Sequence, residues 1–287
     1  MKYYSTQNKI VYTICAFAMM SFLIAVLNSC SPNNVKIDNS VKTIFDQYNV
    51  VGSFGLFDNG AGNFTIYNLK RYRDSAYSPA STFKIVNALI GIETGRISNE
   101  KMIIPWDKTI RVFSNGDTAK DWNKDLSLKE AFKVSAVPYF QEIARRIGKD
   151  TMQFWLDSLK YGNHQMGNYV DSFWLNQSLT ITADEQLGLV KKLYFGQLPF
   201  QKRTHDIVKQ IMLQESNANY QLSYKTGLSS MKNGKTLSWV VGWIEENKHP
   251  YFFVLNLEGA ETVNMKLIRI EILKNILKQQ GFLEGKR

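Results

Sequence analysis

The residues with the clearest chemical potential are Ser81 and Lys84, which stand three positions apart. In a helix, residues i and i+3 lie on one face, so a helix that begins near Pro79 would hold the Lys84 amine over the Ser81 hydroxyl. A serine hydroxyl is a weak nucleophile at neutral pH and needs a neighbouring base. The pair therefore predicts a serine that a carbonyl substrate acylates, with the positive end of the helix dipole favouring the oxyanion.

Two other pairs in the chain have the same spacing, Ser98 with Lys101 and Ser229 with Lys232. An isolated S-x-x-K pair is most often a surface serine and lysine, so spacing alone does not select a nucleophile. Ser81 differs because a long, mostly apolar stretch follows it directly, which predicts a buried central helix. The sequence context therefore singles out Ser81.

The helix after Ser81 belongs to a mainly helical middle of the chain, about residues 79–219. Helical periodicity runs through residues 127–147, and Ser135-Ala136-Val137-Pro138 interrupts it. Proline cannot continue a helix, so we expect a break there. The break would leave Ser135 in a loop between two helices.

Strands are predicted toward both chain ends. Residues 50–57 and 64–67 are β-rich, and the turn residues between them predict a hairpin. An antiparallel meander and a terminal helix follow, with strands over about residues 221–226, 236–245 and 251–257 and the helix over about 261–280. The sequence therefore predicts an α+β fold: an antiparallel sheet built from both chain ends (about residues 45–78 and 220–287) and flanked by helices, with an inserted mainly helical domain.

Composition limits the possible function classes. Of 287 residues, 44% are hydrophobic, which is enough for a sizeable core, and the formal net charge is +10. No basic run exceeds two residues and aromatic residues do not alternate with the basic ones, so we expect no nucleic-acid partner. His164, His205 and His249 stand far apart, without carboxylates or cysteines at metal-ligand spacing, so we expect no metal. Oligomeric state stays open.

The first 29 residues resemble an export signal, with a lysine-bearing polar start and an apolar run over residues 10–27. Leu27-Asn28-Ser29-Cys30 resembles the cleavage site of a bacterial lipoprotein. We expect a lipid on Cys30, a tether over residues 30–44, and a periplasmic protein anchored to the membrane of a Gram-negative bacterium. An uncleaved membrane anchor is the alternative. Cys15 would leave with the signal, so no disulfide is expected.

Three further motifs follow Ser81 in order: Ser135-Ala136-Val137 at the helix break, Tyr161-Gly162-Asn163 in a loop, and Lys225-Thr226-Gly227 at a strand end. As an ordered set they are far more specific than any one alone. With Ser81-Thr82-Phe83-Lys84 they resemble the penicilloyl-serine transferase superfamily, and within it the class D (oxacillinase-type) serine β-lactamases. The resemblance covers about residues 45–283, which would form one catalytic domain.

Several details favour class D over its relatives. Class A enzymes have S-D-N where this chain has Ser135-Ala136-Val137, and Tyr161-Gly162-Asn163 is a class D signature. Three further segments resemble that family: Tyr77-Ser78-Pro79-Ala80, Lys120-Asp121-Trp122 and Trp239-Val240-Val241-Gly242-Trp243. Two positions depart from it: Val86 stands where many members have proline, which concerns helix packing, and Leu228 stands where an aromatic residue is common, which concerns substrate choice.

The resemblance implies that Ser81 is the nucleophile and Lys84 its base. A lysine with an unperturbed pKa near ~10.4 would be protonated at neutral pH, so its environment must differ from water. The predicted apolar wall around Lys84 consists of Phe83, Val137, Trp174 and Leu175. The resemblance further implies that CO2, supplied as bicarbonate, converts Lys84 to N6-carboxylysine, held by the Trp174 indole N–H. No organic cofactor or metal is implied.

The same resemblance assigns the remaining roles. Ser135 relays a proton to the β-lactam nitrogen, and Lys225 supports that transfer. Thr226 and Arg269 bind the substrate carboxylate, which suits the guanidinium fork. The backbone N–H groups of Ser81 and Leu228 form the oxyanion hole. The other substrate-binding residues it implies are Tyr161, Asn163 and Gly227.

The function predicted from these residues is hydrolysis of β-lactam antibiotics through a Ser81 acyl-enzyme, which confers antibiotic resistance. A penicillin-binding receptor or a D-Ala-D-Ala peptidase would share the site but would release a penicilloyl group slowly. Related sensor proteins carry several membrane helices and an H-E-x-x-H segment, and this sequence has one apolar segment and no H-E-x-x-H. A noncatalytic surface lipoprotein is the third alternative, and only the lipid signal supports it. The sequence does not indicate which β-lactams are hydrolysed.

Overall fold

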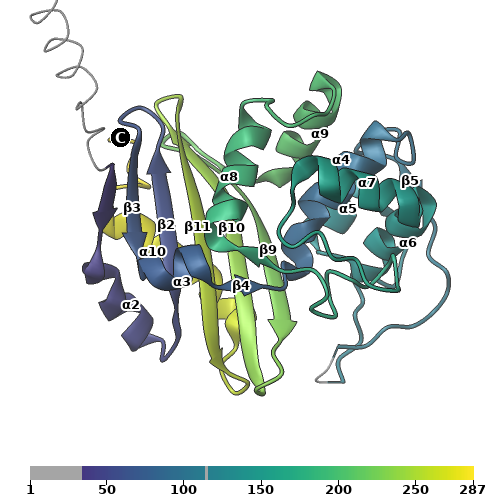
Figure 1. The fold of residues 1–287 in the computed structure, drawn as a ribbon, viewed down its shortest axis with the longest axis horizontal. Coiled ribbons are helices and arrows are strands. Elements are labelled where there is room, and N and C mark those ends of the chain that lie inside the picture. Colours follow the sequence, from purple (N-terminus) through teal and green to yellow (C-terminus); the bar gives the residue numbers. More distant parts are fainter. Residues whose placement is uncertain (1–33, 114–115) are drawn as a thin grey trace, which may run out of the picture. The chain divides into compact units, whose positions relative to one another are not determined.

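A seven-stranded sheet is the centre of the fold. The computed structural model describes residues 34–113 and 116–287. The contacts divide the chain into residues 1–34 and 35–287, and the second unit holds the whole sheet. The strand order is β1-β3-β2-β11-β10-β9-β8 (Figure 1). The strands are β1 (Val35–Ile37), β2 (Val51–Asp58), β3 (Asn63–Tyr67), β8 (Leu213–Ser216), β9 (Gln221–Ser230), β10 (Lys235–Glu246) and β11 (His249–Ala260).

The predicted sheet from both chain ends is confirmed. The hairpin β2–β3 and the meander β9–β10–β11 pair antiparallel, and β11 pairs with β2, which joins the two ends of the chain. Side chains alternate between the two faces of a strand, and β10 shows this directly. Val240 and Ile244 point into one core, whereas Val241 and Trp243 point into the other.

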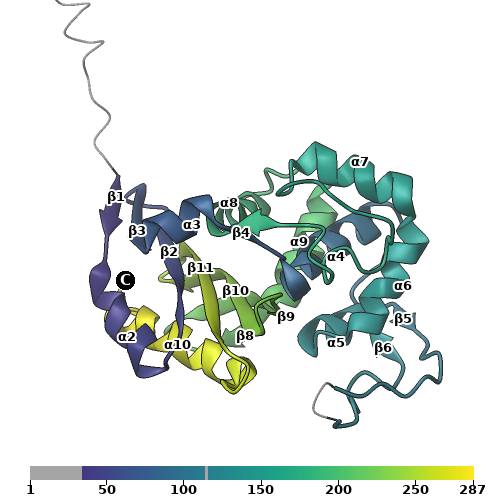
Figure 2. The same ribbon diagram turned by 60° about the horizontal axis from the view of Figure 1, so that its bottom comes forward.

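Helices cover both faces of the sheet. On one face lie α2 (Lys42–Gln47) and α10 (Met265–Gln279), and on the other lie α3 (Leu69–Asp74) and α8 (Ala183–Tyr194) (Figure 2). The remaining helices form the inserted helical part beside β9: α4 (Lys84–Glu93), α5 (Leu128–Lys133), α6 (Val137–Ile147), α7 (Lys149–Leu159) and α9 (Lys202–Met212). The predicted α+β architecture with a helical insertion is therefore confirmed.

Local signals explain the helix ends near the site. Ser127 caps α5 and exchanges hydrogen bonds with Glu130, a capping box. The chain then leaves the helix, and α6 starts at Val137 with Pro138 in its first turn, where proline is tolerated. The predicted break at Ser135 is confirmed. The helical part also contains two small pairings, β4 (Ala76–Tyr77) with β7 (Ile181–Thr182) and β5 (Ile103–Ile104) with β6 (Leu126–Ser127).

The predicted tether is wrong over its second half. β1 pairs in parallel with β3, and the short 3₁₀-helix η1 (Asn39–Val41) and α2 follow it. Val41, Ile44 and Phe45 are buried against the sheet, so this segment belongs to the domain. Residues 1–29, Cys15 and Cys30, and with them the predicted signal, lipid site and anchor, lie outside the described residues. Among the described helices, none has the length and apolar character needed to cross a membrane.

Candidate active site

Ser81 and Lys84 meet at the start of the central helix. A 3₁₀-helix, η2 (Ala80–Phe83), begins after Pro79 and continues directly into α4 at Lys84. In a 3₁₀-helix, side chains at i and i+3 eclipse, which brings this pair closer than an α-helix would. The Lys84 Nζ donates a hydrogen bond to the Ser81 Oγ over 2.6 Å. The predicted juxtaposition of hydroxyl and amine is confirmed.

The surroundings of Lys84 change its acidity. The side chain is 0% exposed, and burial lowers the pKa of its amine from the usual 10.5 to about 7. Desolvation disfavours the charged ammonium, and only the neutral amine can accept a proton. The lowered pKa therefore makes Lys84 a better base at neutral pH. Within the described residues, neither Lys84 nor Lys225 forms an ion pair that would restore the charge. Burial therefore favours the neutral amine of Lys84 near neutral pH.

Ser135 connects the two lysines. Its Oγ lies 3.3 Å from the Lys84 Nζ and 3.0 Å from the Lys225 Nζ. Its backbone has φ of 56°, a left-handed conformation that costs a residue with a side chain about 1–2 kcal/mol. Trp122 fixes this loop because its indole N–H donates to the carbonyl of Val134 over 3.1 Å. Burial, and then the charge of Lys84, holds the pKa of Lys225 well below its usual value.

Aromatic rings form the wall behind Lys84. Phe83 and Trp174 are 0% exposed and stack with ring centroids 5.3 Å apart. Phe140 contributes a third ring, whose centroid lies 5.6 Å from the Lys84 Nζ. The indole N–H of Trp174 is buried and has no hydrogen-bond partner among the described residues. Val137 and Leu175, also predicted for this wall, are half-buried.

The second half of β9 approaches the nucleophile closely, so the Lys225-Thr226-Gly227 motif lies within the strand and not at its end. A Cβ on Gly227 would lie 2.9 Å from the Pro79 carbonyl oxygen, so only glycine fits beside η2. The Gly227 carbonyl accepts a hydrogen bond from Arg269 Nη1 of α10 over 3.0 Å, which places the guanidinium at the same part of the strand as Thr226. Leu228 is 41% exposed at the mouth of the site. Gly227 thus lets the strand lie close to η2 because it has no side chain.

Two predicted substrate-binding residues also make contacts within the scaffold. Tyr161 is 2% exposed and packs its ring against Phe83, with centroids 5.6 Å apart. The Asn163 amide is engaged by the segment that runs toward β7, donating to the Ser178 carbonyl over 2.9 Å and accepting from the Thr180 N–H over 3.0 Å. Tyr161 is buried whereas Asn163 is exposed, and the substrate contacts expected of both stay predictions. Their structural role is to hold this loop under the nucleophile segment.

Several residues that position the site carried no role in the sequence prediction. Trp239 of β10 donates its indole N–H to the Ser78 carbonyl over 2.9 Å, and the Ser78 hydroxyl donates to the Trp174 carbonyl over 2.8 Å. Gln186 of α8 donates to the Thr82 hydroxyl over 2.7 Å. These bonds clamp the nucleophile segment from both sides. Ser78, Thr82 and Trp239 stood in segments that resemble the family, whereas Gln186 gave no signal in the sequence.

The comparisons with known proteins agree with this site. Residues 42–278 match the family model described as the penicillin binding protein transpeptidase domain. β-Lactamase OXA-5 of Pseudomonas aeruginosa is 37% identical, over 84% of this chain and 88% of the relative. The crystal structure of the class D β-lactamase YbXI from Nostoc superimposes with a TM-score of 0.79 at 36% identity, over 85% of this chain and 99% of that one.

A receptor domain is also similar. The C-terminal domain of the Bacillus licheniformis BlaR penicillin receptor matches with a TM-score of 0.79 and 31% identity, over 87% of this chain and 98% of that domain. The similarity therefore extends to both enzymes and a receptor that share one fold. Taken with the Ser81–Lys84–Ser135–Lys225 geometry and the aromatic wall around Lys84, these matches show that the chain belongs to the class D serine β-lactamase family.

Proposed function

We propose that this protein hydrolyses the β-lactam amide of penicillin-type antibiotics through an acyl-enzyme on Ser81, with carboxylated Lys84 as the general base. One observation carries the proposal. The Lys84 amine lies 2.6 Å from the Ser81 hydroxyl, in a buried pocket that lowers its pKa to about 7. A base whose conjugate acid has a pKa near 7 is well suited to proton transfer at physiological pH.

The residues around Lys84 fit a carboxylated side chain. Only a neutral amine can add CO2, and burial makes Lys84 neutral. The orphaned indole N–H of Trp174 is a buried donor that an added carboxylate oxygen would satisfy. Arg269 brings positive charge to the site, because its guanidinium keeps a pKa of about 10 despite burial, so a negative group there is favoured. When present, the carboxylate on Lys84 supplies a general base of lower pKa than an amine.

The other residues would act on the substrate as follows. Ser81 gives up its hydroxyl proton to the base at Lys84 and its Oγ bonds to the lactam carbonyl carbon, while the N–H groups of Ser81 and Leu228 stabilise the oxyanion. The carbon–nitrogen bond then breaks, and Ser135 delivers a proton to the ring nitrogen with Lys225 beside it, 3.0 Å from its Oγ. Thr226 and Arg269 hold the substrate carboxylate. Water cleaves the resulting ester, which releases the ring-opened acid and returns the proton to Ser81.

Hydrolysis of a chromogenic cephalosporin, with and without added bicarbonate, tests the proposal. We expect turnover that bicarbonate increases, and a severe loss in Lys84→Ala with an unchanged fold by circular dichroism. Unchanged turnover in Lys84→Ala would refute the role of Lys84. The matched control is Lys101→Ala, because Lys101 belongs to a second S-x-x-K pair outside this site.

A penicillin receptor is the second candidate, and the similarity to the BlaR receptor domain favours it. A receptor and a D-Ala-D-Ala peptidase would both keep the penicilloyl group on Ser81 for long times. The rate at which the adduct disappears separates them from a hydrolase. Release of terminal D-alanine from a peptide would identify the peptidase.

We also propose export and lipidation at Cys30, on the basis of the apolar run and the Leu27-Asn28-Ser29-Cys30 sequence. The expected protein is periplasmic, in the membrane fraction of a Gram-negative host. Cys30→Ser should move it out of that fraction if the signal is a lipoprotein signal. Membrane association that persists in Cys30→Ser would indicate an uncleaved anchor instead.

A further inference from the structure

A second cavity lies beside the loop that carries Ser135. It has a volume of about 280 Å³ and lies between the segment around β5 and β6 and the first three turns of α6. Its walls contain three aromatic rings, Trp106, Trp122 and Tyr139, together with Pro105 and Pro138. None of these residues has a role in the proposed reaction.

The polar groups of the three rings are already satisfied. Trp106 donates to the Thr109 carbonyl over 2.9 Å, and Tyr139 donates to the Met102 carbonyl over 3.1 Å. The Trp122 N–H is bonded to the backbone carbonyl that precedes Ser135. The rings can therefore offer only their faces and edges, which suit a flat aromatic group.

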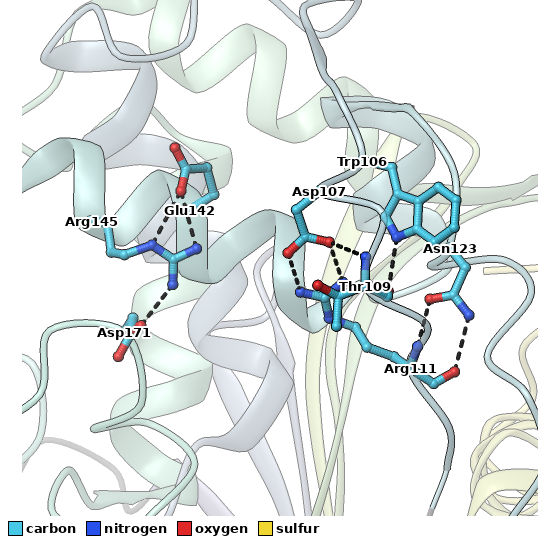
Figure 3. Close-up of polar contacts among 8 residues, drawn as sticks. All are labelled: Trp106, Asp107, Thr109, Arg111, Asn123, Glu142, Arg145 and Asp171. Carbon is cyan, nitrogen blue, oxygen red and sulfur yellow. Dashed lines mark hydrogen bonds and ion pairs between the residues drawn. The ribbon is translucent and has the colours of Figure 1, made fainter.

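The segment that carries Trp106 is fixed before any ligand arrives. Asp107 accepts two hydrogen bonds of 2.7 Å from Arg111, which hold the pKa of its carboxyl well below the usual range. The Asn123 side-chain amide accepts a hydrogen bond from the Arg111 backbone N–H over 2.9 Å and donates one to the Arg111 carbonyl over 3.0 Å. Figure 3 shows this group on one side and Arg145 with Glu142 and Asp171 on the other. A preformed wall lowers the ordering cost of binding.

The cavity lining contains cations that differ in how fully they are paired. Arg111 is paired with Asp107, and Arg145 with Glu142 and Asp171, while Asp125 accepts from the Trp106 N–H. Glu142 is shared, because Arg145 and Arg146 both donate to it. The terminal nitrogens of Arg146 donate to no described residue, and Lys124 has only an exposed partner, Asp121, at 3.8 Å. These two cations remain available to a ligand.

We propose that this cavity binds a small aromatic carboxylate. The ring packs among Trp106, Trp122 and Tyr139, and the carboxylate is held by Arg146 and Lys124. The volume is near the lower end of small-molecule sites, so one substituted ring or a fused pair of rings fits. Such a ligand can be a free aromatic acid or the ring-opened product of a β-lactam with an aryl side chain, because both present the same chemistry.

Binding is tested on the full chain through the indole N–H NMR resonances of Trp106 and Trp122, with phenylacetate as the probe. We expect saturable shifts of both resonances, and at least about tenfold weaker binding in a Lys124→Gln, Arg146→Gln variant, because a charged hydrogen bond contributes about 1.5–3 kcal/mol. Two matched variants, Lys149→Gln on α7 and Arg269→Gln in the active site, should leave the affinity unchanged. Hydrolysed benzylpenicillin is the second probe and separates a product ligand from a free acid.

Phenethylamine has the same ring with the opposite charge. Equal shifts from this amine, no shift from either acid, or full affinity in the Lys124→Gln, Arg146→Gln variant would overturn the proposal. Loss of binding in Arg269→Gln would also overturn it, since the acid would then occupy the active site.

Occupancy should also affect turnover, because Trp122 and the start of α6 flank Ser135 on both sides. We expect saturating phenylacetate to change kcat at least about twofold in the unmodified chain and not in the double variant. This readout rests on the proposed function, whereas the NMR result does not, so failure of one is distinguishable from failure of the other. Binding with an unchanged kcat would show that a ligand in this cavity does not affect Ser135.

Discussion

The Nζ of Lys225 lies 3.0 Å from the Oγ of Ser135, and this hydrogen bond joins the sheet to the helical part of the chain. Lys84 reaches the same hydroxyl from α4 over 3.3 Å. A hydroxyl can accept and donate at once, so Ser135 can pass a proton between the two amines. The site therefore depends on three elements that meet at one oxygen atom.

Replacing Ser135 with alanine should lower kcat by about 100-fold, within the range for the loss of a positioned proton donor. Ser135→Gly should lose the same activity and yet be more stable than Ser135→Ala by about 1 kcal/mol, because glycine adopts φ of 56° without cost. Steady-state kinetics and urea unfolding check the two parts. An active alanine variant would remove Ser135 from the proton path.

Trp174→Phe should lower turnover at ambient bicarbonate and recover part of it at high bicarbonate. The reason is that the variant keeps a ring on Phe83 but removes the orphaned N–H that would hold the carboxylate. Stability should fall because Trp174 is 0% exposed and the smaller ring leaves a cavity, and not because of the N–H, which has no partner to lose among the described residues. Carbon-13 NMR with labelled bicarbonate should show a weaker carbamate signal than the unmodified protein. An identical signal and turnover would contradict this role.

Arg269→Gln should raise KM for penicillins at least about tenfold and leave kcat closer to its original value, because a charged hydrogen bond to the substrate contributes about 1.5–3 kcal/mol. The control is the methyl ester of the same substrate, which has no carboxylate to bind. If the substitution raises KM by the same factor for the acid and for the ester, Arg269 does not bind the substrate carboxylate. It then acts through its 3.0 Å hydrogen bond to the Gly227 carbonyl.

The burial of Lys84 should appear in the pH dependence of stability. Folding lowers the pKa of its amine from 10.5 to about 7, so between these values the unfolded chain binds a proton that the folded chain does not. The free energy of unfolding contributed by this group therefore rises from about pH 7 to about pH 10.5 and is lowest below pH 7.

Lys84→Met should remove that slope and stabilise the protein at pH 7 by roughly 2 kcal/mol or more while abolishing turnover. Urea unfolding in bicarbonate-free buffer at a series of pH values gives the difference between the two proteins, in which the other titrating groups cancel. A Met variant that is less stable than the unmodified chain at pH 7 would contradict the cost assigned to this lysine.

The sequence predicted the parts of the fold that local patterns encode. Turn residues and β-rich runs predicted the hairpin and the meander. The helical spacing of Ser81 and Lys84 predicted that their side chains would meet. β1 was not predicted, because its three residues have no usable period and its stability comes from pairing with β3 and from buried Val41 and Phe45. Long-range contacts of this kind leave no local signal.

The scaffold contacts of Tyr161 and Asn163 also depend on residues distant in the sequence. Tyr161 and Asn163 stand in a segment whose glycine and polar residues are typical of an exposed turn. Burial of Tyr161 depends on Phe83, 78 positions earlier in the chain, and Asn163 is engaged by carbonyl and N–H groups of residues 178 and 180. Motif identity predicted that these residues belong to the site, but only packing distinguishes support from contact with substrate.

Time-resolved intact-mass spectrometry after mixing with benzylpenicillin tests the central claim most directly. We expect an adduct of one penicilloyl group on Ser81 that forms and then disappears as the substrate is consumed. Any adduct that forms in Lys84→Ala should persist, because that variant has no base at this position for deacylation. No adduct in the unmodified protein, an adduct on another residue, or an adduct that does not decay would contradict hydrolysis through Ser81 with Lys84 as its base.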